Sequence, residues 1–234
     1  MNYFAHGRLF IDDPYFLAGT AVPDWLNVSD RRVRVRSKHA IAWVDDPDPH
    51  MAALAQGIAR HHADDRWFHE TAAFAELCWH FTVRIRDLLE PDDGLRPSFL
   101  GHILVEILLD AVLIEESPER LEAYYQAMSR VDGPWVQAAV NRMSPGTSLR
   151  LGEFVGLFVR ERFLWDYGQD GKLWFRLNQV MRRVGLASLP EDFLTLLPEA
   201  RALVADRAGE LLSPPADVIA AAGGRQSSTA EEKP

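Results

Sequence analysis

The stretch "GHILVEILLDAVLI", residues 101–114, is apolar except for His102, Glu106 and Asp110, which follow one another at intervals of four residues. Four residues turn an α-helix by about 400°, so these side chains lie along one line of a helix. A helix that is apolar nearly all round is typical of a protein core, and the stretch therefore predicts a central buried helix. Its polar groups then need positively charged partners inside the molecule, either an arginine or a metal ion.

The rest of the chain also predicts helices. Helical periodicity dominates from residue 50 onward and is interrupted by runs rich in Pro, Gly, Ser and Asp. We expect helices near 50–70, 71–90, 97–115, 118–131, 133–143, 148–166, 171–184 and 190–212. Only "RRVRVRS", residues 31–37, alternates with the period of a strand. The sequence thus predicts a single all-α multi-helix domain over residues 1–213, with a metal site between helices, and a disordered tail over residues 214–234.

The composition narrows the classes of protein to which the chain could belong. Its 234 residues are 47% hydrophobic and 25% charged, as in an ordinary globular protein, and the net charge of −9 argues against general nucleic-acid binding. The single cysteine, Cys78, excludes an internal disulfide and fits a reducing compartment. We see no signal peptide at the N-terminus and no uncharged apolar run of about 18 residues, so we expect a cytoplasmic protein without a transmembrane segment.

A second line of ligand-type side chains strengthens the metal interpretation. In "GIARHHADDRWFHET", residues 57–71, His61, Asp65 and His69 again follow one another at intervals of four. Imidazoles and a carboxylate on one helical stripe suit zinc, manganese or iron. All eight histidines lie within the first 102 residues, as a metal centre built from the N-terminal half would require.

The spacing also limits which side chains can share an ion. His102 and Glu106 lie one helical turn apart and could bind the same ion, whereas Asp110 lies about 12 Å along the helix axis from His102. We therefore expect Asp110 to serve a neighbouring ion, to support a ligand through a hydrogen bond, or to pair with an arginine.

Three short blocks near the N-terminus resemble a known family. They are "AHGRLF" with His6, "FLAGTAVPDWL" with Asp24 at an expected turn after Pro23, and "GIARHHADDRWFH". In this order and spacing they resemble the start of the zinc-dependent phospholipase C family. The positions of Met1, His6 and Asp24 are also similar to those of bacterial acyl carrier protein phosphodiesterase. The matching blocks fall within residues 1–115, and each block is short.

The resemblance implies a helical hydrolase that cleaves a phosphoester or phosphodiester bond with a metal-activated water. It implies two or three divalent ions, of which we expect two here, with zinc preferred and manganese or iron as alternatives. The substrate would be a phosphoester small molecule, a lipid or an acidic carrier protein. Asp24 would be a metal ligand or the catalytic general base. The ligands that the resemblance implies are His6, Asp24, His39, His61, Asp65, His69, His102 and Glu106.

The sequence departs from both families. The secreted phospholipases use their mature N-terminal amine as a ligand, and we expect that ligand to be missing here because the chain shows no signal peptide. The acyl carrier protein enzymes have acids where this chain has His69 and His102.

Two other functions stay open. The chain could be a non-catalytic partner-binding protein with a structural metal or a buried polar network, and the basic run at residues 31–38 could then be its binding surface or a solvated segment. A di-iron carboxylate protein is disfavoured, because its Glu-x-x-His ligands are spaced by three residues rather than four.

Overall fold

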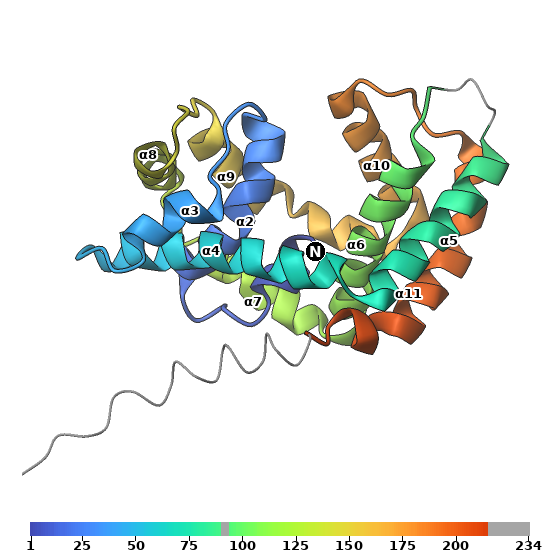
Figure 1. Ribbon diagram of the computed structural model, residues 1–234, viewed down its shortest axis with the longest axis horizontal. Helices are drawn as coiled ribbons and strands as arrows, with labels where there is room; N and C mark the ends of the chain where they lie inside the picture. The colour runs from blue at the N-terminus through green and yellow to red at the C-terminus, as the bar shows by residue number, and fades with distance from the viewer. Residues whose placement is uncertain (90–93, 215–234) are drawn as a thin grey trace, which may run out of the picture.

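Helix α6 (Pro97–Glu116), which contains the opening stretch, is the central helix of the computed structural model, which describes residues 1–89 and 94–214 (Figure 1). It packs against α1 (Tyr3–Gly7), α5 (Ala72–Leu88) and α11 (Leu197–Leu211). By length and hydropathy α6 could cross a membrane, but 67% of the window that passes this test is buried inside the molecule, as in a core helix. All regular structure within the described residues is helical, so the predicted all-α domain is confirmed.

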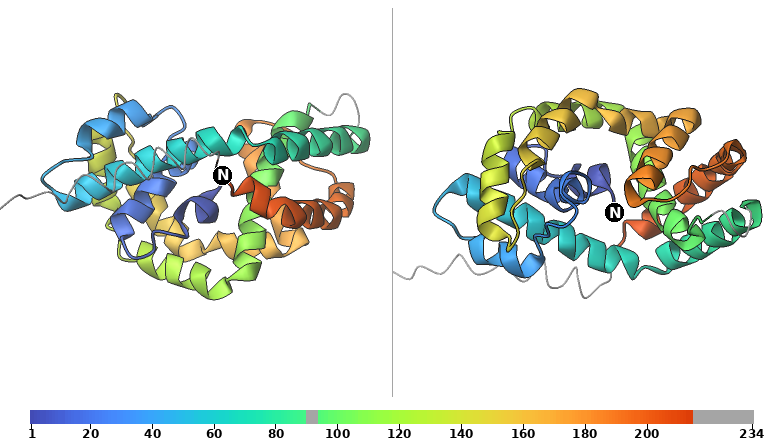
Figure 2. Two further views of the ribbon diagram at one scale, coloured as in Figure 1. Left: turned by 60° about the horizontal axis from the view of Figure 1, so that its bottom comes forward. Right: turned by 90° about the horizontal axis from the view of Figure 1, so that it is seen from above.

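The helices form two groups on either side of the N-terminus. One group contains α2 (Pro14–Ser29), α3 (Ser37–Ala40), α8 (Gly133–Met143) and α9 (Leu151–Glu161), and the other contains α5, α6, α10 (Asp170–Val184) and α11 (Figure 1). The long helix α4 (Pro49–His69) runs from the first group towards the second, and α7 (Pro118–Met128) lies below α4. Both views of Figure 2 show the N-terminus enclosed between the helices.

Two glycines allow α2 and α4 to cross at very short range. A Cβ atom on Gly19 would lie 2.3 Å from the carbonyl oxygen of Leu54, and one on Gly57 would lie 2.1 Å from that of Phe16. Only glycine fits where two helix backbones approach this closely. The crossing lies about one helical turn before His61 and so fixes α2 next to the part of α4 that carries the predicted ligands.

Most predicted helices are found within a few residues of their expected bounds, and the differences have local causes. Asp24 lies inside α2, with Pro23, so the expected turn is wrong. The helix expected over 148–166 ends at Arg162, whose φ of 48° is left-handed, and continues as the 3-10 helix η2 (Phe163–Gly168). The alternating segment 31–37 forms no strand. The tail expected over 214–234 lies outside the described residues from 215 onward.

The remaining elements are short. They are the 3-10 helices η1 (Ile41–Trp43) and η3 (Glu191–Leu196), the second of which leads into α11.

Candidate metal centre

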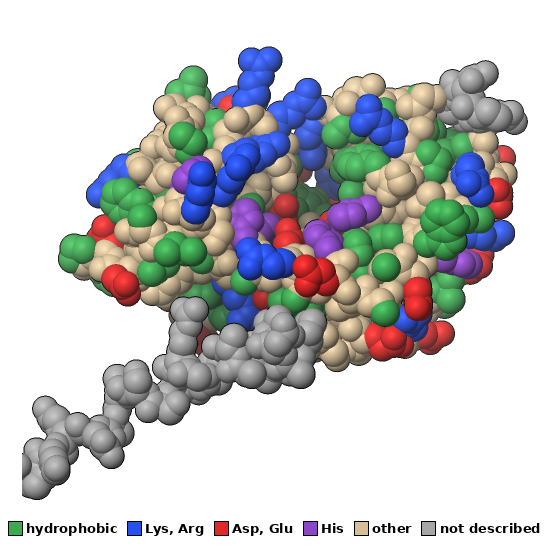
Figure 3. Space-filling model, viewed as in Figure 1, with side chains coloured by type: hydrophobic (Ala, Val, Ile, Leu, Met, Phe, Trp, Pro, Cys, Tyr) green, Lys and Arg blue, Asp and Glu red, His purple; other side chains and the backbone are tan. Residues whose placement is uncertain are grey.

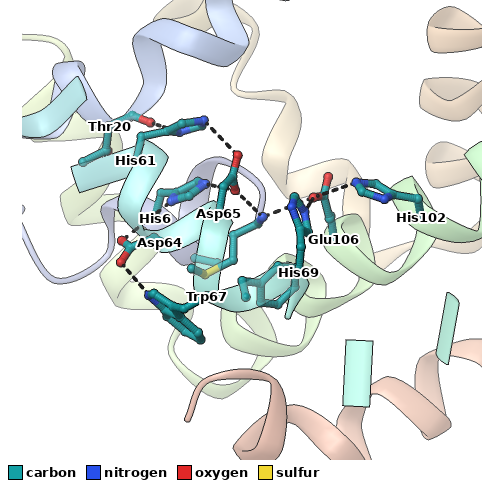
Figure 4. Close-up of polar contacts among 12 residues, drawn as sticks. His6, Thr20, His61, Asp64, Asp65, Trp67, His69, His102 and Glu106 are labelled. Atoms are coloured by element: carbon teal, nitrogen blue, oxygen red, sulfur yellow. Dashed lines mark hydrogen bonds and ion pairs between the residues drawn. The ribbon is translucent and has the colours of Figure 1, made fainter. Parts of the chain in front are cut away.

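The line of ligand-type residues on α4 divides between two clusters (Figure 4). His61 and Asp65 join His6 of α1, and these three residues are called the His6 cluster. The Nε2 atoms of His6 and His61 lie 3.1 and 3.3 Å from separate oxygens of Asp65. The two imidazole rings stack with their centroids 4.1 Å apart. Both histidines are buried, whereas 30% of the Asp65 side chain is exposed.

The last member of the α4 line faces α6. His69 joins His102 and Glu106, and these three residues are called the His69 cluster. The Nε2 atoms of His69 and His102 lie 2.8 and 3.3 Å from the same oxygen, Oε1 of Glu106. This cluster is more accessible than the first, because 33% of the His69 side chain and 42% of the His102 side chain are exposed.

The distances within both clusters suit a metal ion. Metal bonds of about 2.0–2.1 Å in a tetrahedral arrangement separate ligand atoms by about 3.3 Å. In each cluster one ligand atom from every residue lies within 4.8 Å of the others. The clusters therefore bring together two possible three-ligand sites, each with room for a water or a substrate oxygen in a fourth position.

The tautomer of His61 supports a cation in the His6 cluster. Nδ1 of His61 lies 2.8 Å from the carbonyl oxygen of Thr20, which can only accept, so Nδ1 carries a proton. In neutral His61 the Nε2 lone pair then faces a carboxylate oxygen of Asp65 at 3.3 Å. Two acceptors repel at this distance unless a proton or a metal ion lies between them. A buried imidazole oriented through its other nitrogen is the usual arrangement of a metal ligand.

Asp64, next to Asp65 in the sequence, supports His6 from behind. One oxygen of Asp64 lies 3.8 Å from Nδ1 of His6, which has no hydrogen-bond partner in the described part of the chain. The Asp64 carboxylate accepts hydrogen bonds from Arg60 at 2.8 Å and from the indole of Trp67 at 3.1 Å. A carboxylate that accepts a hydrogen bond from a histidine orients the ring and increases its basicity, and Asp64 is held at a distance from which a small movement of His6 would form that bond.

The α-ammonium group of Met1 connects the two clusters. It donates hydrogen bonds to Asp65 at 2.8 Å and to Glu106 at 3.1 Å, and only 3% of the Met1 side chain is exposed. The expectation that no N-terminal amine lies at the site is therefore not met. A positive charge between the two carboxylates shows that the space between the clusters stabilises a cation.

The pKa values of the carboxyl groups follow from these contacts. Burial alone would raise the pKa of Asp65 and of Glu106, but histidine hydrogen bonds and the Met1 ammonium outweigh it and hold both values well below their usual range. Asp24 differs, because burial raises its pKa and the nearby His61 and His6 only partly oppose the increase. Asp24 makes no hydrogen bond within the described residues.

Asp110 has a structural role that the sequence left open. Its two oxygens accept hydrogen bonds from the backbone N–H groups of Phe4 at 2.9 Å and Ala5 at 2.7 Å. The side chain is fully buried, and burial raises its pKa to about 7. Asp110 thus holds the backbone of α1, which carries His6, and supports the site without being a ligand.

His39 belongs to neither cluster. It lies in α3, where its Nδ1 accepts a hydrogen bond from the backbone N–H of Arg36 at 3.3 Å. Its assignment as a ligand followed from the family resemblance, and the structure gives it a role at the start of a short helix instead. His62 is also outside the clusters, and its Nε2 donates to the carbonyl oxygen of Val35 at 2.8 Å.

A cavity of about 800 Å³ borders the His69 cluster at Glu106. Asp24 and Glu106 line it, together with Asn2 and Tyr3 from the start of the chain. Figure 3 shows histidine and acidic side chains next to one another beside a hollow, with Lys and Arg side chains along its edge. A ligand in this cavity could contact Glu106 and Asp24.

Comparisons of the chain with protein-family models, with curated proteins and with solved structures find no match. Inference about function therefore rests on the geometry of the two clusters and the cavity beside them.

Proposed function

We propose that this protein is a metal-dependent hydrolase of phosphoesters or phosphodiesters with a two-ion centre. The observation that carries the proposal is the pair of three-residue clusters that meet at α4, one of which borders a cavity of about 800 Å³ through Glu106. Paired metal sites next to a substrate-sized cavity are a common arrangement for hydrolysis at phosphorus.

Each cluster would bind one of the two ions. His6, His61 and Asp65 would hold one ion, and His69, His102 and Glu106 the other. Four imidazoles with carboxylates suit zinc best, with manganese and iron as alternatives. When bound, the ions would supply a nucleophile that is active near neutral pH and positive charge for the phosphate oxygens.

Asp24 is the best general base among the described residues. Its carboxylate lines the cavity, is free of hydrogen bonds there, and has a raised pKa. A carboxylate whose pKa is closer to neutrality accepts a proton more effectively at working pH. Asp24 could equally be a further ligand, and the two roles differ in whether its loss removes metal.

The Met1 ammonium group has to lose its proton or move when metal ions bind at the site. An ammonium group between Asp65 and Glu106 would repel a cation bound beside it. Metal binding therefore requires the amine either to lose its proton and become a ligand or to move away. Burial by itself favours the neutral amine, although the two carboxylates raise its pKa overall.

Metal content and activity together test the proposal. The protein, purified without a histidine tag, should bind about two equivalents of zinc and hydrolyse bis-p-nitrophenyl phosphate in the presence of zinc or manganese. His61→Ala and His102→Ala should each lose about one equivalent and most of the activity. His80→Ala is the matched control, because His80 belongs to neither cluster and its one ion-pair partner among the described residues is Glu199, at 3.7 Å.

A non-catalytic protein with a polar network is the second candidate, and one observation favours it. The Met1 ammonium already gives Asp65 and Glu106 a positive partner, and four histidines contact the same carboxylates, without any metal. Less than half an equivalent of zinc, with no thermal shift on adding it, would contradict every metal-based function and leave this alternative.

A further inference from the structure

The cavity next to Glu106 is lined by charged side chains of both signs. Its acids are Asp24, Glu106 and Glu161, and its arginines include Arg31, Arg34 and Arg183. Arg31 and Arg34 lie between α2 and α3, and Arg183 lies in the last turn of α10. The Arg31 guanidinium donates to the carbonyl oxygen of Arg183 at 2.9 Å and so ties these two sides of the cavity together.

These three arginines, called the arginine rim, lack acidic partners. No carboxylate lies within 4.0 Å of any of them among the described residues, whereas Arg176, which also lines the cavity, pairs with Asp166 at 2.6 Å. An arginine that faces a cavity without a carboxylate is suited to bind an anion from solution, and its planar fork fits phosphate oxygens.

An apolar wall lies in the same cavity. Phe99, Ile103 and Ile107 of α6 are spaced by four residues, so they form a strip one residue removed from the line of His102 and Glu106. Phe154 and Leu157 of α9 also line the cavity. A ligand beside the metal ligands would therefore contact aromatic and aliphatic side chains as well as the arginine rim.

We infer that the substrate carries, besides the scissile phosphoester, a second phosphate group and an apolar or aromatic moiety. The scissile group would lie at Asp24 and Glu106, the apolar moiety along the α6 strip, and the second phosphate at the arginine rim. This inference rests on the proposed phosphoester hydrolysis and specifies the substrate class for the same site. The cavity volume of about 800 Å³ is in the range that holds a ligand of this size.

A pair of chromogenic esters tests the inference directly. Thymidine 5′-(p-nitrophenyl phosphate) and its 3′-phosphate derivative differ only in the second phosphate. The zinc-loaded protein should hydrolyse the 3′-phosphate derivative with a kcat/KM about tenfold higher at low salt, and the ratio should fall as salt screens the arginines. In the double variant Arg34→Ala/Arg183→Ala the ratio of the two kcat/KM values, with and without the 3′-phosphate, should approach one.

A charge-matched control separates the rim from overall charge. The double variant Arg86→Ala/Arg130→Ala also removes two positive charges, but both side chains are exposed and lie outside the cavity, so this variant should keep the wild-type ratio of kcat/KM values. A ratio of one or less in the wild-type protein, or equal losses in the two double variants, would overturn the inference.

A binding measurement distinguishes failure of this inference from failure of the hydrolase proposal. Calorimetry would compare thymidine 3′,5′-bisphosphate with thymidine 5′-phosphate on the zinc-loaded protein. Tighter binding of the bisphosphate that depends on Arg34 and Arg183, without turnover of any ester, would support the rim and contradict hydrolysis. Turnover of both esters without a preference, and equal binding of both nucleotides, would support hydrolysis and contradict the rim.

Discussion

Adjacent residues on α4 have different roles at the site, and this difference can be tested by single substitutions. Asp65 contacts both histidines of the His6 cluster and the Met1 amine, whereas Asp64 faces the back of His6. Asp65→Asn should remove about one equivalent of zinc. Asp64→Asn should keep the stoichiometry and weaken zinc affinity about 10–100-fold, as loss of a supporting carboxylate does. Zinc titration followed by metal analysis measures both, and equal effects of the two substitutions would contradict this division.

Asp110 shows what residue spacing can and cannot predict. The interval of four placed it on the line of His102 and Glu106, but its partners are backbone N–H groups about a hundred residues away in sequence. No pattern of side chains reveals a backbone partner, so the sequence could only offer alternatives. The Met1 amine escaped prediction for a similar reason, because its position depends on how α1 enters the fold.

Substitution of Asp110 tests its role in holding α1. In Asp110→Asn one carboxylate oxygen becomes an amide NH₂ that faces a backbone N–H, so at least one buried hydrogen bond is lost. We expect the free energy of unfolding to fall by about 1–3 kcal/mol, measured by urea denaturation. Zinc affinity should fall as well, since His6 is attached to α1. Unchanged stability and unchanged affinity would show that Asp110 does not hold this helix.

At the scale of elements, the crossing of α2 and α4 positions the His6 cluster. The methyl group in Gly57→Ala would meet the carbonyl oxygen of Phe16, which is backbone and can move only with its helix. We expect a loss of stability of about 2–3 kcal/mol and weaker zinc binding. Gly209→Ala in α11 is the matched control, because nothing lies within 4 Å of its Cβ position and alanine favours the helix by about 0.5–1 kcal/mol. A Gly57 variant as stable as the wild type would refute the close crossing.

The helices from residue 50 onward follow from the sequence, because apolar periodicity reports which face of a helix is buried. The first two helices do not, since α1 has only five residues and α2 contains Pro23 and Gly19. Spacing also predicted the residues of both clusters except His6, which came from the family resemblance. Spacing could not show that His61 and Asp65 meet α1 whereas His69 meets α6, because tertiary packing decides which helices lie opposite α4.

At the scale of the whole molecule, the candidate centre connects three helices. The clusters take ligands from α1, α4 and α6, so one bound ion would link α1 to α4 and the other would link α4 to α6. Zinc at about a hundred times its dissociation constant should stabilise the native state by about 2.7 kcal/mol per site. For a chain of this size that corresponds to a rise in Tm of about 5–10 °C per site. Calorimetry with and without a chelator measures the rise, and an unchanged Tm would show that no ion binds the native state.

The central claim, that the two clusters hold metal ions, is tested most directly by X-ray diffraction from crystals of the zinc-loaded protein at the zinc absorption edge. The account predicts two anomalous peaks, one within bonding distance of Nε2 of His6 and His61 and an oxygen of Asp65, and the other bounded by His69, His102 and Glu106. Crystals with no anomalous peak at either cluster, while the Met1 ammonium still bridges Asp65 and Glu106, would contradict it.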